Sequence, residues 1–104
     1  ISQRQVALKI VDAHMGDEWA PTLLLQLGEA GRSFDLYEHG HSGLSDAYLN
    51  WLWQPEPWSR KARQDVAFQG FAKRLGMVDY WKRYGWPDLC KPAPSAGQDA
   101  FTCR

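Results

Sequence analysis

Residues 64–84 read QDVAFQGFAKRLGMVDYWKRY, and this stretch indicates the fold class most directly. The apolar side chains of its first half recur at intervals of three and four residues, which is the spacing of one face of an α-helix. They are Val66, Phe68, Phe71, Ala72 and Leu75. We expect this helix to begin near residue 63 or 65 and to end at Gly76. A short second helix is expected from Val78 to Tyr84, before Gly85.

The same helical spacing recurs upstream, while no segment shows the sustained alternation that is typical of strands. Helices are expected over residues 4–15, from an N-cap at Asp17 to about Leu27, and over residues 32–39 and 46–53. Residues 54–57 read QPEP and are expected to run extended between helices. The sequence therefore predicts an all-α fold of antiparallel helix pairs.

The end of the chain differs in composition from the rest. Its last 14 residues read KPAPSAGQDAFTCR, which is rich in proline, serine and glycine and predicts an irregular segment. We therefore divide the chain into a helical domain, residues 1–89, and an irregular C-terminal tail, residues 90–104. The tail is expected to pack on or near the last helices.

The charge is balanced overall but unevenly distributed. Twelve basic and twelve acidic residues leave no net charge, which argues against direct nucleic-acid binding by this segment. Residues 1–52 carry a net charge of about −4 and residues 53–104 a net charge of about +4. One interpretation is a basic face that meets an acidic partner or an anionic membrane surface. The other is a solvated helical array with one acidic and one basic end. The basic residues concerned are Arg60, Lys61, Arg63, Lys73, Arg74, Lys82 and Arg83. No stretch approaches the roughly 20 apolar residues of a membrane span.

Five positions follow the spacing of one tetratricopeptide repeat, and this part of the chain resembles that family. They are Leu27, Gly28, Ser33, Tyr37 and Gly40. In such repeats small residues let two helices approach closely, and an aromatic ring fills the groove between neighbouring repeats. The resemblance implies a right-handed array of helix hairpins.

A second resemblance covers residues 64–92 together with DAFTC at 99–103. This region is similar to the C-terminal end of bacterial proteins that carry tetratricopeptide repeats behind another module, such as a winged-helix transcriptional regulator or an adenylate cyclase. The shared features are Asp65 and Phe68, Leu75-Gly76-Met77, Asp79-Tyr80-Trp81, the Gly85–Cys90 run GWPDLC, and Phe101 with Cys103. The resemblance implies an architecture and a place in a larger protein, and no catalytic residues. Because Ile1 opens the chain, we expect a longer protein upstream.

The chain has two cysteines, Cys90 and Cys103, which flank the tail. A disulfide between them would hold the tail down and contribute about 3 kcal/mol by restricting the unfolded chain. The alternative is two free thiols in a reducing compartment. A bridged pair would favour a periplasmic location, and free thiols a cytoplasmic one.

No catalytic or metal-binding pattern stands out. His39 and His41 lie close in sequence, but the chain has no Cys-x-x-Cys or His-Glu-x-x-His spacing of the kind zinc sites use. Its carboxylates are scattered, and Gly40-His41-Ser42-Gly43 lacks the lysine of a phosphate-binding loop. We therefore expect no catalytic residue, no metal and no cofactor, and a protein that is not an enzyme.

Five aromatic residues are the candidate binding residues, because large rings exposed on a domain suggest a binding site. They are Trp51, Trp53, Trp58, Trp81 and Tyr84. The function we predict is a protein or peptide interaction module in a larger bacterial regulatory protein. Two alternatives stay open: a small-ligand sensing domain with an aromatic-lined pocket, and a structural spacer or dimerisation segment that forms a homodimer.

Overall fold

The computed structural model describes residues 2–17, 19–39 and 46–104. Within these residues the chain forms seven α-helices, one turn of 3-10 helix and a two-stranded antiparallel sheet, so the predicted all-α class is confirmed for the bulk of the fold. The helices are α1 (Gln3–Ala13), α2 (Ala20–Gln26), α3 (Ala30–His39), α4 (Asp46–Trp51), α5 (Pro57–Gln64), α6 (Val66–Arg74) and α7 (Met77–Tyr84). The 3-10 turn is η1 (Pro94–Ala96), and the strands are β1 (Cys90–Pro92) and β2 (Phe101–Cys103).

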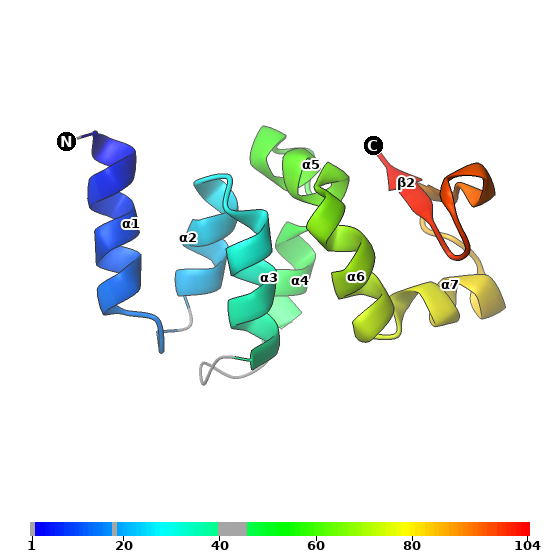
Figure 1. Ribbon diagram of the computed structural model, residues 1–104, viewed down its shortest axis with the longest axis horizontal. Coiled ribbons are helices and arrows are strands. Elements are labelled where there is room, and N and C mark those ends of the chain that lie inside the picture. Colours follow the sequence, from blue (N-terminus) through cyan, green and yellow to red (C-terminus); the bar gives the residue numbers. More distant parts are fainter. Residues whose placement is uncertain (1, 18, 40–45) are drawn as a thin grey trace.

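The helices are laid out in chain order along an elongated molecule that measures 43 × 26 × 22 Å. Figure 1 shows α1, α2 and α3 side by side, each running opposite to the one before it. The helices α5, α6 and α7 and the short sheet occupy the other end (Figure 1). Packing also joins helices that are not adjacent in the sequence, since α3 contacts α6 and α2 contacts α5.

Local sequence explains where several helices begin. Ser2 and Gln5 form a capping box at the start of α1, and the Asp65 carboxylate accepts a 2.9 Å hydrogen bond from the Ala67 amide at the start of α6. Pro57 is the first residue of α5, where a missing amide proton leaves no helical hydrogen bond unmade. The sequence prediction missed α5 because it treated this proline as part of an extended linker.

The main core is built from aromatic rings of α3, α4, α6 and α7. Phe34 and Phe71 stack with ring centroids 4.3 Å apart, and Phe68 lies 5.7 Å from Phe34; all three side chains are fully buried. Large rings bury much apolar area per residue, which allows so short a chain to form a core.

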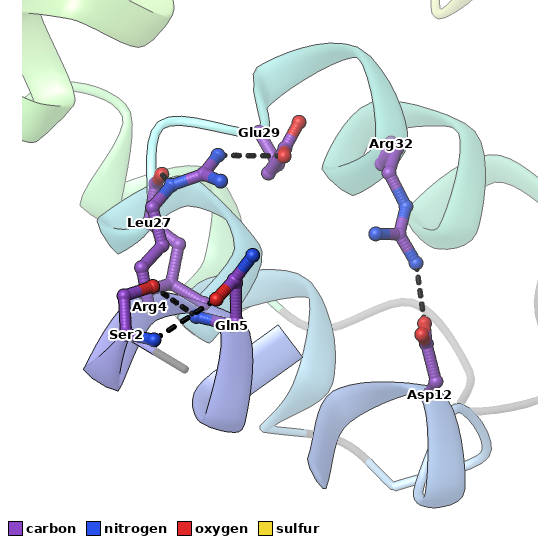
Figure 2. Close-up of polar contacts among 7 residues, drawn as sticks. All are labelled: Ser2, Arg4, Gln5, Asp12, Leu27, Glu29 and Arg32. Atoms are coloured by element: carbon purple, nitrogen blue, oxygen red, sulfur yellow. Dashed lines mark hydrogen bonds and ion pairs between the residues drawn. The ribbon is translucent and has the colours of Figure 1, made fainter. Parts of the chain in front are cut away.

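A smaller apolar cluster holds α1 against the rest of the molecule. Val11 of α1 packs with Leu24 of α2 and Leu36 of α3. Two ion pairs also connect α1 to later parts of the chain (Figure 2): Arg4 reaches Glu29, and Arg32 of α3 reaches Asp12, each at 2.6 Å. Exposed ion pairs contribute little, so the apolar cluster is the main attachment of α1.

The tail is more ordered than the sequence predicts. Residues 90–104 were expected to be irregular, but β1 and β2 pair in register, with Cys90 opposite Cys103. The strands are three residues long, which is too short for an alternating pattern to be recognised in the sequence. The Phe101 side chain is buried, 5.7 Å from Phe68 and 5.5 Å from Trp81 by ring centroids, so the sheet contributes to the core.

Candidate functional site

The structure divides the five predicted aromatic residues into three groups. Trp51 and Trp58 form an adjacent pair, with ring centroids 5.5 Å apart, and Trp51 is 41% exposed. Trp53 and Trp81 meet edge to face at 6.0 Å, and Trp81 is buried in the core. Tyr84 is exposed at the end of α7. Trp58 lines one groove and contacts Trp51, which does not line it, while Trp53 lines a different cavity.

This groove lies between the α2–α3 turn and α5 and has a volume of about 450 Å³. Leu25 and Leu27 line one side of it, while Trp58 and Lys61 of α5 line the other. Its lining is therefore part apolar and part polar, with one cation, Lys61, and one carboxylate, Asp65. A volume and lining of this kind suit the side chain of a peptide or a small molecule.

The Trp51–Trp58 pair is positioned by a hydrogen bond between two helices. The buried Ser59 hydroxyl donates to the Trp51 carbonyl oxygen at 2.6 Å. This bond ties the end of α4 to the first turn of α5, which carries Trp58. The bond also satisfies a carbonyl at the end of α4 that has no partner within its own helix.

The turn that forms the other wall depends on Gly28. Its φ of +79° lies in the left-handed region that favours glycine. The Glu29 amide then donates to the Leu24 carbonyl at 2.9 Å, which ends α2 in the way that many helices end. Leu27 is the residue at the end of α2 and lines the groove.

Two more of the predicted repeat positions pack between helices. Ser33 is fully buried, and its hydroxyl contacts α2 and α4. Tyr37 stacks on Tyr48 with ring centroids 4.3 Å apart and meets Phe71 edge to face at 6.0 Å. Gly40 lies outside the described residues. These contacts show close helix packing around α3; a tetratricopeptide array remains a prediction.

The basic residues predicted to share a face are used in different ways. Arg74 donates to both carboxylate oxygens of Glu38, from Nε at 3.0 and 2.9 Å and from Nη2 at 2.6 Å. Lys82 donates to the Asp99 carboxylate at 2.7 Å. The hydrogen bond from Arg74 holds the pKa of Glu38 below its ordinary value. Arg63 is buried in the protein. The predicted basic face is therefore interrupted by intramolecular contacts.

A metal centre has no support in the part of the chain that the structure describes. No group of three or more histidine, cysteine, aspartate or glutamate side chains gathers there. His39 contacts Asp35 at 3.2 Å, and His41 lies outside the described residues. None of the helices described is long and apolar enough to cross a membrane.

Cys90 and Cys103 form a disulfide, with 2.06 Å between the sulfur atoms. The bridge joins β1 to β2 at the open end of their pairing. Two hydrogen bonds attach β2 to α6: the Gln69 side chain donates to the Phe101 carbonyl at 2.7 Å and accepts from the Phe101 amide at 3.2 Å. The bridge and these bonds hold the tail on the helices.

Comparisons with protein-family models, with curated proteins and with solved structures find no match for this chain. The tetratricopeptide resemblance of residues 27–40 and of residues 64–103 therefore stays a prediction. The grooves and side chains of the chain itself provide the basis for inferring a function.

Proposed function

We propose that this chain is a non-catalytic interaction module that binds a protein or peptide segment in the groove between the α2–α3 turn and α5. The observation that supports this proposal best is the groove of about 450 Å³ lined by Trp58, whose ring lies 5.5 Å from that of the half-exposed Trp51. Grooves between helices are common sites for recognising peptides, and tryptophan is enriched in the residues that carry binding energy.

The groove also suggests what the bound segment contains. Leu27 and Trp58 offer apolar surface for one aliphatic or aromatic side chain of the partner. Lys61 is exposed and makes no ion pair with any residue that the structure describes. A carboxylate next to the inserted apolar side chain would complement this lysine when it lies on the side away from Asp65, which also lines the groove. The preferred partner is therefore a segment that pairs an apolar residue with an acidic one.

The disulfide and the second resemblance suggest a cellular setting. Disulfides persist in oxidising compartments such as the bacterial periplasm. The proposed setting is thus the extracytoplasmic end of a larger bacterial regulatory protein, where an occupied groove would report to a module elsewhere in that protein. Cys90 and Cys103 would keep the tail folded there.

A selected peptide tests the groove directly. A random peptide library displayed on phage would be selected against the immobilised protein, and the enriched peptides titrated by calorimetry. Gln26, an exposed residue at the rim of the groove, would be changed to tryptophan so that the new ring fills it. We expect Gln26→Trp to weaken binding at least about tenfold, which corresponds to roughly 1.4 kcal/mol.

The matched control places the same ring elsewhere. Gln98 is exposed in the tail and does not line the groove, and Gln98→Trp should leave the affinity unchanged. Lys61→Glu should weaken acidic peptides and spare neutral ones. Peptides that bind Gln26→Trp as tightly as the unmodified protein, or a library that yields no specific binder, would overturn the proposal.

A further inference from the structure

The Arg63 guanidinium is buried without a side-chain counter-ion. The residue is 3% exposed, and its hydrogen bonds go to main-chain oxygen atoms. Nη1 donates to Leu52 at 2.6 Å and to Gln54 at 2.9 Å, while Nε donates to Arg104 at 2.9 Å. No Asp or Glu side chain binds it in the described part of the chain. A buried charge is costly unless an opposite charge accompanies it.

Two of the five N–H groups of this guanidinium remain unused. Nη2 makes no hydrogen bond to any residue that the structure describes. In that same part of the chain, no fully enclosed side-chain nitrogen or oxygen lacks a partner. Nη2 is therefore not fully enclosed, and Arg63 lines a cavity of about 520 Å³. This leaves a cationic donor pair available to a ligand.

The lining of the cavity adds to its positive charge. Arg60 and Arg104 also line it, and among the described residues that line it none is an aspartate or glutamate; the Arg104 main-chain oxygen is already bonded to Arg63. Arg60 forms no side-chain hydrogen bond or ion pair with the described residues. Arg60 and Arg63 line the same cavity; burial lowers the pKa of Arg63, and repulsion from the charge of Arg60 lowers it further. An anion between them would relieve this repulsion.

The remaining walls combine apolar residues with two glutamines. The apolar residues are Trp53, Pro55 and Leu89. Trp53 is held in place by edge-to-face contacts with Phe68 and Trp81, each at 6.0 Å. A fixed indole beside a guanidinium suits a ligand that has a flat or aliphatic body and an anionic end.

We propose that this cavity binds a small organic anion, with its carboxylate or phosphate oxygens held by Arg60 and Arg63 and its apolar body placed against Trp53 and Leu89. Guanidinium groups match both oxyanions because their planar N–H groups can donate two parallel hydrogen bonds. The site is separate from the peptide groove: Arg60 lines this cavity and its neighbour Lys61 lines the groove. The two proposals can therefore fail independently.

Three small probes test this site: benzoate, phenyl phosphate and the uncharged benzamide. The readout is the indole N–H resonance of Trp53 in a ¹H–¹⁵N NMR spectrum, which reports on one wall of the cavity. We expect a saturable shift with at least one of the two anions and none with benzamide. The tighter of the two anions identifies the headgroup chemistry. Raising the salt concentration should weaken the binding, because Arg60 is exposed.

Two neighbouring substitutions provide the matched pair. Arg60→Gln removes one guanidinium from an exposed position and should weaken anion binding at least about tenfold. Lys61→Gln removes an adjacent charge that lines the peptide groove and should leave anion binding unchanged. Equal shifts with benzamide, full binding by Arg60→Gln, or no saturable shift with either anion would each overturn the proposal.

Discussion

The Ser33 hydroxyl oxygen lies 2.6 Å from the Tyr48 hydroxyl and 2.6 Å from the Pro21 carbonyl oxygen. Serine has one O–H to donate, and the carbonyl can only accept, so Ser33 donates to Pro21 and accepts from Tyr48. Both side chains are buried, and burial raises the pKa of Tyr48, which keeps its proton in place. This chain of two hydrogen bonds ties α3 to α2 and to α4.

The direction of these bonds predicts unequal effects of two substitutions. Ser33→Ala leaves the buried Tyr48 hydroxyl without an acceptor and should cost about 1–3 kcal/mol of unfolding free energy. Tyr48→Phe leaves the bond from Ser33 to Pro21 intact and should cost about 0.5–1.5 kcal/mol. Urea unfolding followed by circular dichroism measures both. Ser33→Ala should also cost less when Tyr48→Phe is already present, and a Tyr48→Phe loss larger than that of Ser33→Ala would contradict the assignment.

The disulfide predicts a redox-dependent stability. Cys90 and Cys103 are separated by 13 positions, and removing a bridge over a loop of this size costs about 3 kcal/mol. We expect the double variant Cys90→Ala with Cys103→Ala to unfold at lower denaturant concentration than the oxidised protein. A reducing agent should lower the midpoint of the unmodified protein to a similar extent and leave the double variant unaffected. A midpoint that does not respond to reduction would contradict this.

The helices that the sequence predicts best are those with a clear apolar stripe. The pattern around Phe68 and Phe71 placed α6 close to its observed bounds. In α5, by contrast, the buried residues are Ser59, Ala62 and Arg63. None of these is a large apolar residue, so the stripe that marks a buried helix face is missing. The helix α5 depends instead on tertiary contacts, chiefly the hydrogen bonds from Ser59 to the Trp51 carbonyl and from Arg63 to the Arg104 main-chain oxygen.

The candidate sites were only partly accessible from the sequence. Aromatic content pointed to Trp51 and Trp58, but their pairing depends on how the α4–α5 turn folds. Arg63 was grouped with exposed basic residues because a charged residue is seldom buried. The anion cavity combines it with Arg104, which is distant in sequence and reaches it through the β1–β2 pairing. The spacing of apolar residues within one helix does not predict contacts such as that between Arg63 and Arg104.

The contact between Glu38 and Arg74 predicts a loss of stability in acid. The pKa of Glu38 is lower in the folded protein than its ordinary value of 4.5. The contact therefore stabilises the folded state fully when the pH is above 4.5. This stabilisation is lost as the pH falls through the lowered pKa of the folded protein. Melting temperatures measured from pH 6 downward should therefore fall more steeply for the unmodified protein than for Glu38→Gln. Asp88→Asn serves as the control, since the Asp88 side chain makes no ion pair in the described part of the chain. Parallel curves for the unmodified protein and Glu38→Gln would contradict the prediction.

The attachment of α1 predicts that one apolar side chain matters more than an ion pair. Val11 is fully buried against Leu24 and Leu36, whereas the Asp12 side chain that pairs with Arg32 is 58% exposed (Figure 2). Truncating a buried side chain leaves a cavity, so Val11→Ala should cost about 1–3 kcal/mol, and Asp12→Asn less than about 1 kcal/mol. In hydrogen exchange, Val11→Ala should speed exchange in α1 while α6 stays protected, because α6 belongs to the other core cluster. Faster exchange of α1 in Asp12→Asn than in Val11→Ala would show instead that the ion pairs hold this helix.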